Sequence, residues 1–179
     1  MKLTRYFTAF TICCILVSCK GDRQHLQETI LNSEATLKSG SELTPDPVKA
    51  KAIIALYTEY AAHYPEDTLS AGYLFKAADV SSKINEAQKA IELYGQFSKA
   101  YPGHKNAPYA LFLQGFIYET QLGDPAKAKP YYEQFLSLYP NHPLAKDVKF
   151  SLENLGKSPE DLIREFESRQ SADSIKADS

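Results

Sequence analysis

The sequence contains no tryptophan and one methionine, and its three cysteines all fall within the first nineteen residues. If those residues include a cleaved signal, Cys13 and Cys14 leave with it and Cys19 is the one cysteine of the mature chain. A single cysteine forms neither an internal disulfide nor a thiolate metal site. We therefore expect the fold to be held together by packing alone.

Long runs of one charge are also missing. Lys2 and Arg5 account for two of the 20 basic side chains, so 18 remain against 22 acidic ones, a net charge near −4 with no basic stripe. Without such a stripe to neutralise phosphates, we do not expect nucleic acid as a partner. The chain also lacks a Gly-rich phosphate loop, a nucleophile elbow and a His-Glu-x-x-His helix. We expect no enzyme activity, cofactor, metal or small-molecule substrate.

The N-terminus has the layout of a secretory signal peptide. Lys2 and Arg5 precede an apolar run from Tyr6 to Val17. That run is shorter than the roughly 20 residues that a transmembrane helix needs, and a charged start before a short apolar core is typical of an exported protein. We predict that residues 1–18 are a signal peptide.

The end of this segment, Leu16-Val17-Ser18-Cys19, resembles the lipobox of bacterial lipoproteins. The resemblance implies cleavage before Cys19 and lipid attachment to it, so the membrane contact would be through acyl chains. Lys20 in the next position implies the outer membrane in bacteria that use an aspartate as the retention signal. The alternative is an ordinary signal peptide that is cut nearby.

Apolar residues recur at helical spacing along most of the remaining chain. A helix is predicted over residues 22–39, and the Gly- and Pro-containing stretch that follows is a connection. Residues 19–46 are therefore predicted to be a lipid-anchored N-terminal helix and linker. No segment alternates as a strand would, and the strongest helical patterns cover residues 48–65, 69–83, 85–102, 107–124 and 126–140.

A Tyr-Pro pair closes three of these segments. Pro65, Pro102 and Pro140 are 37 and then 38 residues apart. Proline keeps the residue before it out of the helical conformation, so each pair marks a helix end. Fixed self-similarity at this period predicts a solenoid of helix pairs.

Two of the Tyr-Pro pairs are followed by a histidine, His104 and His142. One interpretation makes these residues metal ligands or general bases. Ligands of one zinc ion lie about 2 Å from it, whereas equivalent positions of neighbouring helix pairs are about 8–10 Å apart. We therefore interpret the histidines as turn residues.

The C-terminal part predicts one more helix pair and then a tail. Ser158 and Asp161 resemble a capping box, and Pro159 suits the first position of a helix. The apolar face of that helix is thin and its remaining surface is charged, as at the polar end of a solenoid. The repeat domain is predicted over residues 47–167, and residues 168–179 are predicted to be a polar, disordered tail.

The helix pairs resemble the tetratricopeptide repeat, and the resemblance covers roughly residues 48–166. It implies an all-α, right-handed solenoid of antiparallel helix pairs. Gln114 departs from the expected leucine, whereas the small, aromatic and proline positions match at Gly115, Tyr118, Ala128, Tyr132 and Pro140, and one repeat earlier at Ala90, Tyr94 and Pro102. Small residues at these positions would let paired helices approach closely.

In tetratricopeptide repeats the first helix of each pair lines a concave surface that binds peptides or helices. Carried over by position, the resemblance implies partner contacts at Tyr109, Phe112, Phe116, Glu119, Ala71 and Leu74. The alternative for the aromatic residues is core packing against the next pair. Tyr109 is the strongest candidate, because a tyrosine ring serves an interface and tolerates water.

Repeats of this length with Tyr-Pro ends, on a lipidated chain, are similar to two groups of bacterial envelope proteins. One is the lipoprotein of the outer-membrane β-barrel assembly machinery, and the other is the periplasmic coordinator of the Tol-Pal system. The resemblance implies a protein-binding scaffold that faces the periplasm. An accessory binding module for peptidoglycan- or polysaccharide-processing machinery is an alternative, and a hydrolase on a helical fold is a third.

Overall fold

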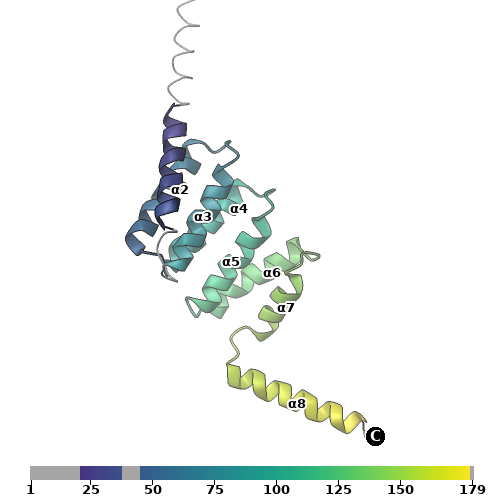
Figure 1. The fold of residues 1–179 in the computed structure, drawn as a ribbon. Coiled ribbons are helices and arrows are strands. Elements are labelled where there is room, and N and C mark those ends of the chain that lie inside the picture. The colour runs from purple at the N-terminus through teal and green to yellow at the C-terminus, as the bar shows by residue number, and fades with distance from the viewer. Residues whose placement is uncertain (1–20, 38–44, 178–179) are drawn as a thin grey trace, which may run out of the picture. The chain divides into compact units, whose positions relative to one another are not determined.

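The computed structural model describes residues 21–37 and 45–177, and every regular element in these ranges is a helix (Figure 1). The predicted signal peptide and Cys19 lie outside the described residues. An N-terminal helix over residues 21–37 is followed by α2 (Pro47–His63), α3 (Ser70–Lys83), α4 (Ala87–Ala100), α5 (Ala107–Thr120), α6 (Pro125–Leu138), α7 (Ala145–Asn154) and α8 (Pro159–Ala177). Within the same ranges no helix combines the length and apolarity needed to span a bilayer.

The chain divides into two compact units, Met1–Ala110 and Leu111–Ser179, and the boundary falls within α5. In the first unit α3 contacts both α2 and α4. Ala77 and Ala90 have no exposed surface, and Tyr73 packs edge-on against Tyr60 with their ring centroids 4.9 Å apart. Small and aromatic side chains therefore fill this core together, without a cysteine.

Each Tyr-Pro pair ends a helix with the same backbone geometry. Tyr64, Tyr101 and Tyr139 have φ values of −129°, −129° and −130° and ψ values of 57°, 57° and 52°. The N–H of each tyrosine still donates to the carbonyl four residues earlier, but its ψ has left the helical region because a proline follows. The predicted helix ends are confirmed.

The third residue after each of these tyrosines caps the turn that leads into the next helix. It accepts a hydrogen bond from the backbone N–H two residues further on: Asp67 Oδ1 from Leu69 (2.9 Å), His104 Nδ1 from Asn106 (3.1 Å) and His142 Nδ1 from Leu144 (3.2 Å). The two imidazole rings also pack edge-on against Phe97 and Phe135. The histidines hold turns, and Asp67 does the same in the first loop.

The N-terminal helix packs against α2 and α3, although the sequence predicts it as part of a segment outside the repeat domain. Its Ile30 has no exposed surface, and Glu34 Oε1 accepts a hydrogen bond from Tyr57 Oη at 2.7 Å. Glu119 of α5 accepts from Tyr132 of α6 in the same way, at 2.5 Å. Tyr57 and Tyr132 hold equivalent positions in the repeat, so the N-terminal helix and α2 form a helix pair that the sequence pattern did not indicate.

The second unit is built around the approach of α5 to α6. Its core consists of Leu111, Ala128, Tyr132, Phe135 and Val148. Gly115 lies directly against the Tyr132 ring, because a Cβ placed on it would meet Tyr132 Cε1 at 2.9 Å. Asp124 accepts from the N–H of Lys127 and caps α6, and Pro125 occupies its first turn.

The last helix starts where the sequence predicts and ends later. Ser158 and Asp161 exchange hydrogen bonds as a capping box, with the Asp161 N–H 3.1 Å from Ser158 Oγ. Helix α8 then continues to Ala177, past the predicted start of a disordered tail at residue 168. Residues 160–177 contain neither proline nor glycine, so nothing local ends a helix that has been capped and started.

Candidate protein-interaction surfaces

Helix α5 leaves large aromatic side chains in contact with water. Tyr109 and Phe116 are each 41% exposed, and their spacing of seven residues places them on the same face, two turns apart. Between them Phe112 is half-buried and stacks on Tyr132, with ring centroids 5.9 Å apart. We call Tyr109, Phe112 and Phe116 the aromatic row.

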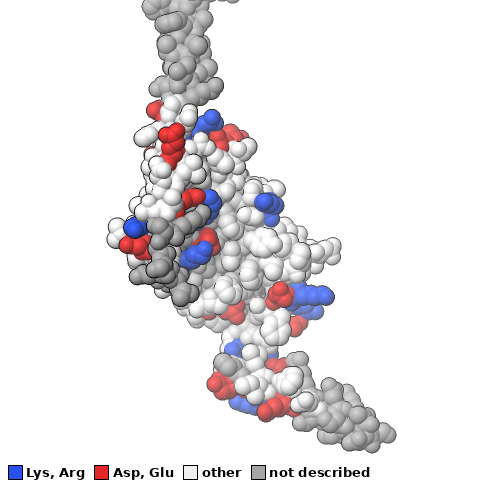
Figure 2. Space-filling model, viewed as in Figure 1, with Lys and Arg blue, Asp and Glu red and all other residues white. Residues whose placement is uncertain are grey.

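The part of α5 that carries this row is uncharged. No residue from Ala107 to Tyr118 carries a charge, and much of the surface over α5 is white in Figure 2. Exposed aromatic residues on a stretch of helix without charges are typical of a contact surface for an apolar segment of a partner.

Glu119, which ends the predicted set of contacts on α5, is committed to internal packing. Its Oε2 accepts a hydrogen bond from Tyr132 Oη, and the Tyr132 ring has no exposed surface. Burial and the nearby carboxylate both raise the pKa of the Tyr132 hydroxyl, which therefore stays protonated as the donor. Glu119 positions Tyr132 under the aromatic row.

Ala71 and Leu74 are not on the surface, which corrects their prediction as partner contacts. They are 7% and 6% exposed. Their helix, α3, packs against both α2 and α4, which leaves little of its surface open. In the first unit these two residues contribute to packing.

Four of the residues predicted to shape the repeat are buried, as close packing of the helices requires. Ala90, Tyr94, Ala128 and Tyr132 are at most 1% exposed. Tyr118 is half-buried and stacks on Tyr131 at 5.6 Å, and the Lys127 ammonium lies 5.8 Å from the Tyr118 ring centroid. Pro102 and Pro140 are exposed in the turns.

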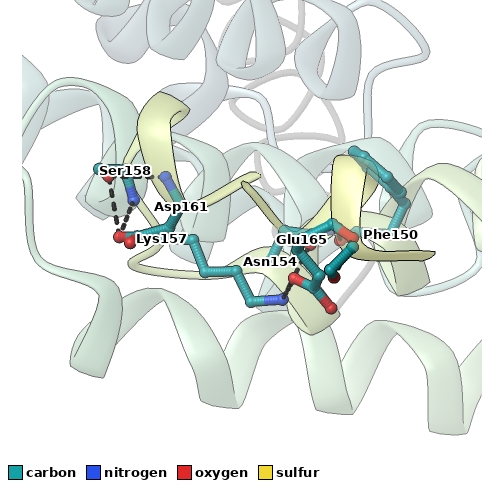
Figure 3. Close-up of polar contacts among 7 residues, drawn as sticks. Phe150, Asn154, Lys157, Ser158, Asp161 and Glu165 are labelled. Carbon is teal, nitrogen blue, oxygen red and sulfur yellow. Dashed lines mark hydrogen bonds and ion pairs between the residues drawn. The ribbon is translucent and has the colours of Figure 1, made fainter. Parts of the chain in front are cut away.

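A groove between α7 and α8 is a surface that the sequence did not predict. Its volume is about 520 Å³, and its walls include Phe150 and Phe166, which are 64% and 66% exposed. Among the residues that line it, Lys157 Nζ contacts Glu165 Oε2 at 2.6 Å and Asn154 Oδ1 at 3.2 Å (Figure 3). The thin apolar face of residues 159–166 was the available signal, but its pairing with α7 is a tertiary contact.

A smaller groove of about 280 Å³ lies where the N-terminal helix meets α2 and α3. Glu34, Tyr57 and Lys76 line one side of it. The Lys76 ammonium bonds to Glu34 Oε1 at 2.7 Å and lies 5.7 Å from the Tyr57 ring centroid. Burial and the Glu34 carboxylate raise the pKa of Tyr57, so its hydroxyl remains a donor to Glu34.

The shifted ionisable groups in the described residues belong to packing and capping. They are buried tyrosines and the exposed Asp124–Lys127 pair at the start of α6, where hydrogen bonds from Lys127 lower the pKa of Asp124. Residues 21–37 and 45–177 contain no group of three His, Cys, Asp or Glu side chains arranged to hold a metal ion.

Comparison with known families identifies two segments of the chain. The family model of the tetratricopeptide repeat matches residues 73–104 and 109–142. These segments cover most of the α3–α4 pair and of the α5–α6 pair, so both pairs are similar to tetratricopeptide repeats, and the predicted helical-repeat fold class is confirmed. A search of curated protein sequences found no match.

Proposed function

We propose that the protein is a non-catalytic scaffold of the bacterial cell envelope, anchored by a lipid on Cys19, that binds a partner protein through the aromatic row of α5. The observation that supports this most directly is the exposure of Tyr109 and Phe116, each 41%, on the first helix of a tetratricopeptide repeat. Repeats of this family are modules for binding other proteins.

The chemistry of the row describes the segment that it would bind. The side chains from Ala107 to Tyr118 are uncharged, and Phe112 stacks on the buried Tyr132 ring. A prearranged aromatic surface loses little side-chain entropy on binding. It suits an apolar face of a helix or the alternate side chains of an extended peptide.

Photocrosslinking tests this surface. A photoreactive residue at Tyr109 should capture a specific envelope protein in native cells, whereas the same residue at Leu138, which is exposed on α6 of the same repeat, should not. Equal capture from both positions would contradict a binding role of the row. Retention on peptidoglycan without protein capture would instead favour the alternative of an accessory module for wall-processing machinery.

The anchor has its own test. Replacing Cys19 with serine should move the protein from the membrane fraction to the soluble fraction of the periplasm, because acyl chains would then be missing. Cys14→Ser is the matched control, since it changes a cysteine of the same leader and should leave the protein in the membrane fraction. Outer-membrane location, facing the periplasm, is tested by separating the two membranes. A Cys19→Ser protein that still sediments with membranes would refute the lipid anchor.

A further inference from the structure

The N-terminal helix covers a tyrosine face on α2 and α3. This face consists of Tyr57, Tyr60 and Tyr73. Tyr57 stacks on Tyr73 with centroids 5.3 Å apart, and Tyr60 meets Tyr73 edge-on at 4.9 Å. Ile30, near the middle of the N-terminal helix, has no exposed surface.

Charged side chains hold the helix near both of its ends. Arg23 Nη1 lies 2.8 Å from Asp67 Oδ2, in the loop after α2. Glu34 Oε1 accepts from Tyr57 Oη and from Lys76 Nζ, both at 2.7 Å. Eleven residues of helix separate Arg23 from Glu34, about 16 Å along the axis, so the contacts extend along the length of the tyrosine face.

The residues that pair with Arg23 and Glu34 are Asp67 and Lys76, and the equivalent positions of the next repeat carry no charge. Asp67 holds the turn position that His104 holds after α4, and it keeps the turn hydrogen bond while adding a carboxylate for Arg23. Lys76 precedes Leu113 by 37 residues, the same spacing that separates Asp67 from His104. In this part of the chain Asp67 and Lys76 each meet an opposite charge on the N-terminal helix. This arrangement indicates that the surface is adapted to bind that helix.

The N-terminal helix nevertheless has fewer buried side chains than a helix within the repeats such as α4. Of residues 21–37 only Ile30 is buried, whereas α4 buries Ala87, Ala90, Ile91, Leu93, Tyr94 and Phe97. Its ion pairs are on partly exposed side chains, which contribute little and weaken with salt. In the sequence, residues 38–46 separate it from α2, whereas only residues 84–86 separate α3 from α4. Segments with few buried contacts open first.

We propose that the tyrosine face is a helix-binding site and that residues 21–37 are its built-in, detachable ligand. The contacts of residues 21–37 define the kind of ligand that the site would bind. It is an amphipathic helix with an arginine, an aliphatic residue seven positions later and a glutamate four positions after that, as in Arg23, Ile30 and Glu34. This site is separate from the aromatic row and does not depend on the function proposed for it.

Hydrogen exchange of the full chain tests detachment. Amides of residues 21–37 should exchange at least tenfold faster than those of α4, and 1 M NaCl should increase their rate while leaving α4 unchanged. The double variant Arg23→Gln/Glu34→Gln should reproduce the effect of salt. The matched control Lys89→Gln/Glu92→Gln removes an exposed ion pair on α4 and should leave residues 21–37 unchanged. Protection of residues 21–37 equal to that of α4 at both salt concentrations would overturn the proposal.

Binding in trans tests the site itself. The receptor is the full chain with Arg23→Glu/Glu34→Lys, whose own helix repels Asp67 and Lys76. A fluorescent peptide of residues 21–37 should bind to it, and the same peptide with Ile30→Asp should bind at least tenfold more weakly. A receptor that also carries Asp67→Lys/Lys76→Glu should no longer bind the wild-type peptide, because its new charges repel Arg23 and Glu34 of the peptide.

Folding of the receptor is checked by its circular dichroism. If the double variant is not folded, the wild-type chain is used instead, and excess unlabelled peptide should accelerate exchange of residues 21–37 by competition. Equal binding of the wild-type and Ile30→Asp peptides, or no effect of excess peptide on exchange, would show that the face does not bind a helix.

Discussion

Replacing Gly115 with alanine is a direct test of how closely α5 approaches α6. A Cβ at this position would lie 2.9 Å from Tyr132 Cε1 and 3.0 Å from Tyr131 Cβ. The Tyr132 ring has no exposed surface and its hydroxyl is held by Glu119, so it cannot swing aside without losing that hydrogen bond. Overpacking of this kind costs about 1–3 kcal/mol.

A second effect of the substitution opposes the first. Alanine in a helix interior is favoured over glycine by about 1 kcal/mol, so the expected net loss for Gly115→Ala is up to about 2 kcal/mol. Gly72 in α3 is the matched control, because a Cβ there would meet no atom within 4 Å. Gly72→Ala should therefore raise the free energy of unfolding by about 0.5–1 kcal/mol.

Urea unfolding followed by far-ultraviolet circular dichroism measures both variants. The expected order of stability is Gly72→Ala, wild type and then Gly115→Ala, with about 1–3 kcal/mol between the two variants because the packing term is the difference between them. The slope of the free energy against urea should stay constant. If Gly115→Ala stabilises the chain as much as Gly72→Ala does, the close approach of α5 to Tyr132 is refuted.

Three further predictions concern other positions of the repeats. His104→Ala should cost about 1 kcal/mol in the same unfolding assay because it removes a turn hydrogen bond, whereas His104→Asp should cost less, since Asp67 makes that bond in the first loop; equal losses would refute the turn role. Burial, followed by the Asp67 carboxylate, raises the pKa of Tyr60 from 10.0 to about 12, so the unfolded state ionises first and stability falls as the pH rises from about 10 to about 12. Tyr60→Phe should make that fall shallower, and an unchanged pH profile would contradict the shift. Ala128→Leu should lower stability by about 1–3 kcal/mol through overpacking, and an unchanged melting temperature would count against the repeat register.

The helix ends were predictable because their cause is local. A proline acts on the residue directly before it, so the spacing of Pro65, Pro102 and Pro140 is enough to divide the chain into helix pairs. The turn role of His104 and His142 was also within reach, because their repetition at one position argues against a shared ion. Start signals such as the Ser158 capping box act over three residues and were correctly placed.

The partners of the helices could not be predicted in the same way. Ala71 and Leu74 match the exposed positions of a first helix, but whether a position on α3 is open depends on α2 and α4, which pack on both sides of it. The N-terminal helix has only one buried residue, Ile30, so its apolar pattern is too weak to indicate that it pairs with α2. The hydrogen bonds from Tyr57 and Lys76 to Glu34 join residues that are far apart in the sequence.

The sequence by itself determined the class of the fold, the repeat length and the helix ends at the Tyr-Pro pairs, because these follow from periodicity and from residues that act on their immediate neighbours. Only the tertiary structure decided which side chains remain exposed. Tyr109 and Phe116 stay at the surface while Ala71 and Leu74 are covered, and Glu34 becomes a ligand of Tyr57. Exposure is a property of all the surfaces that surround a side chain, and contacts between distant helices are fixed only when the helices have packed.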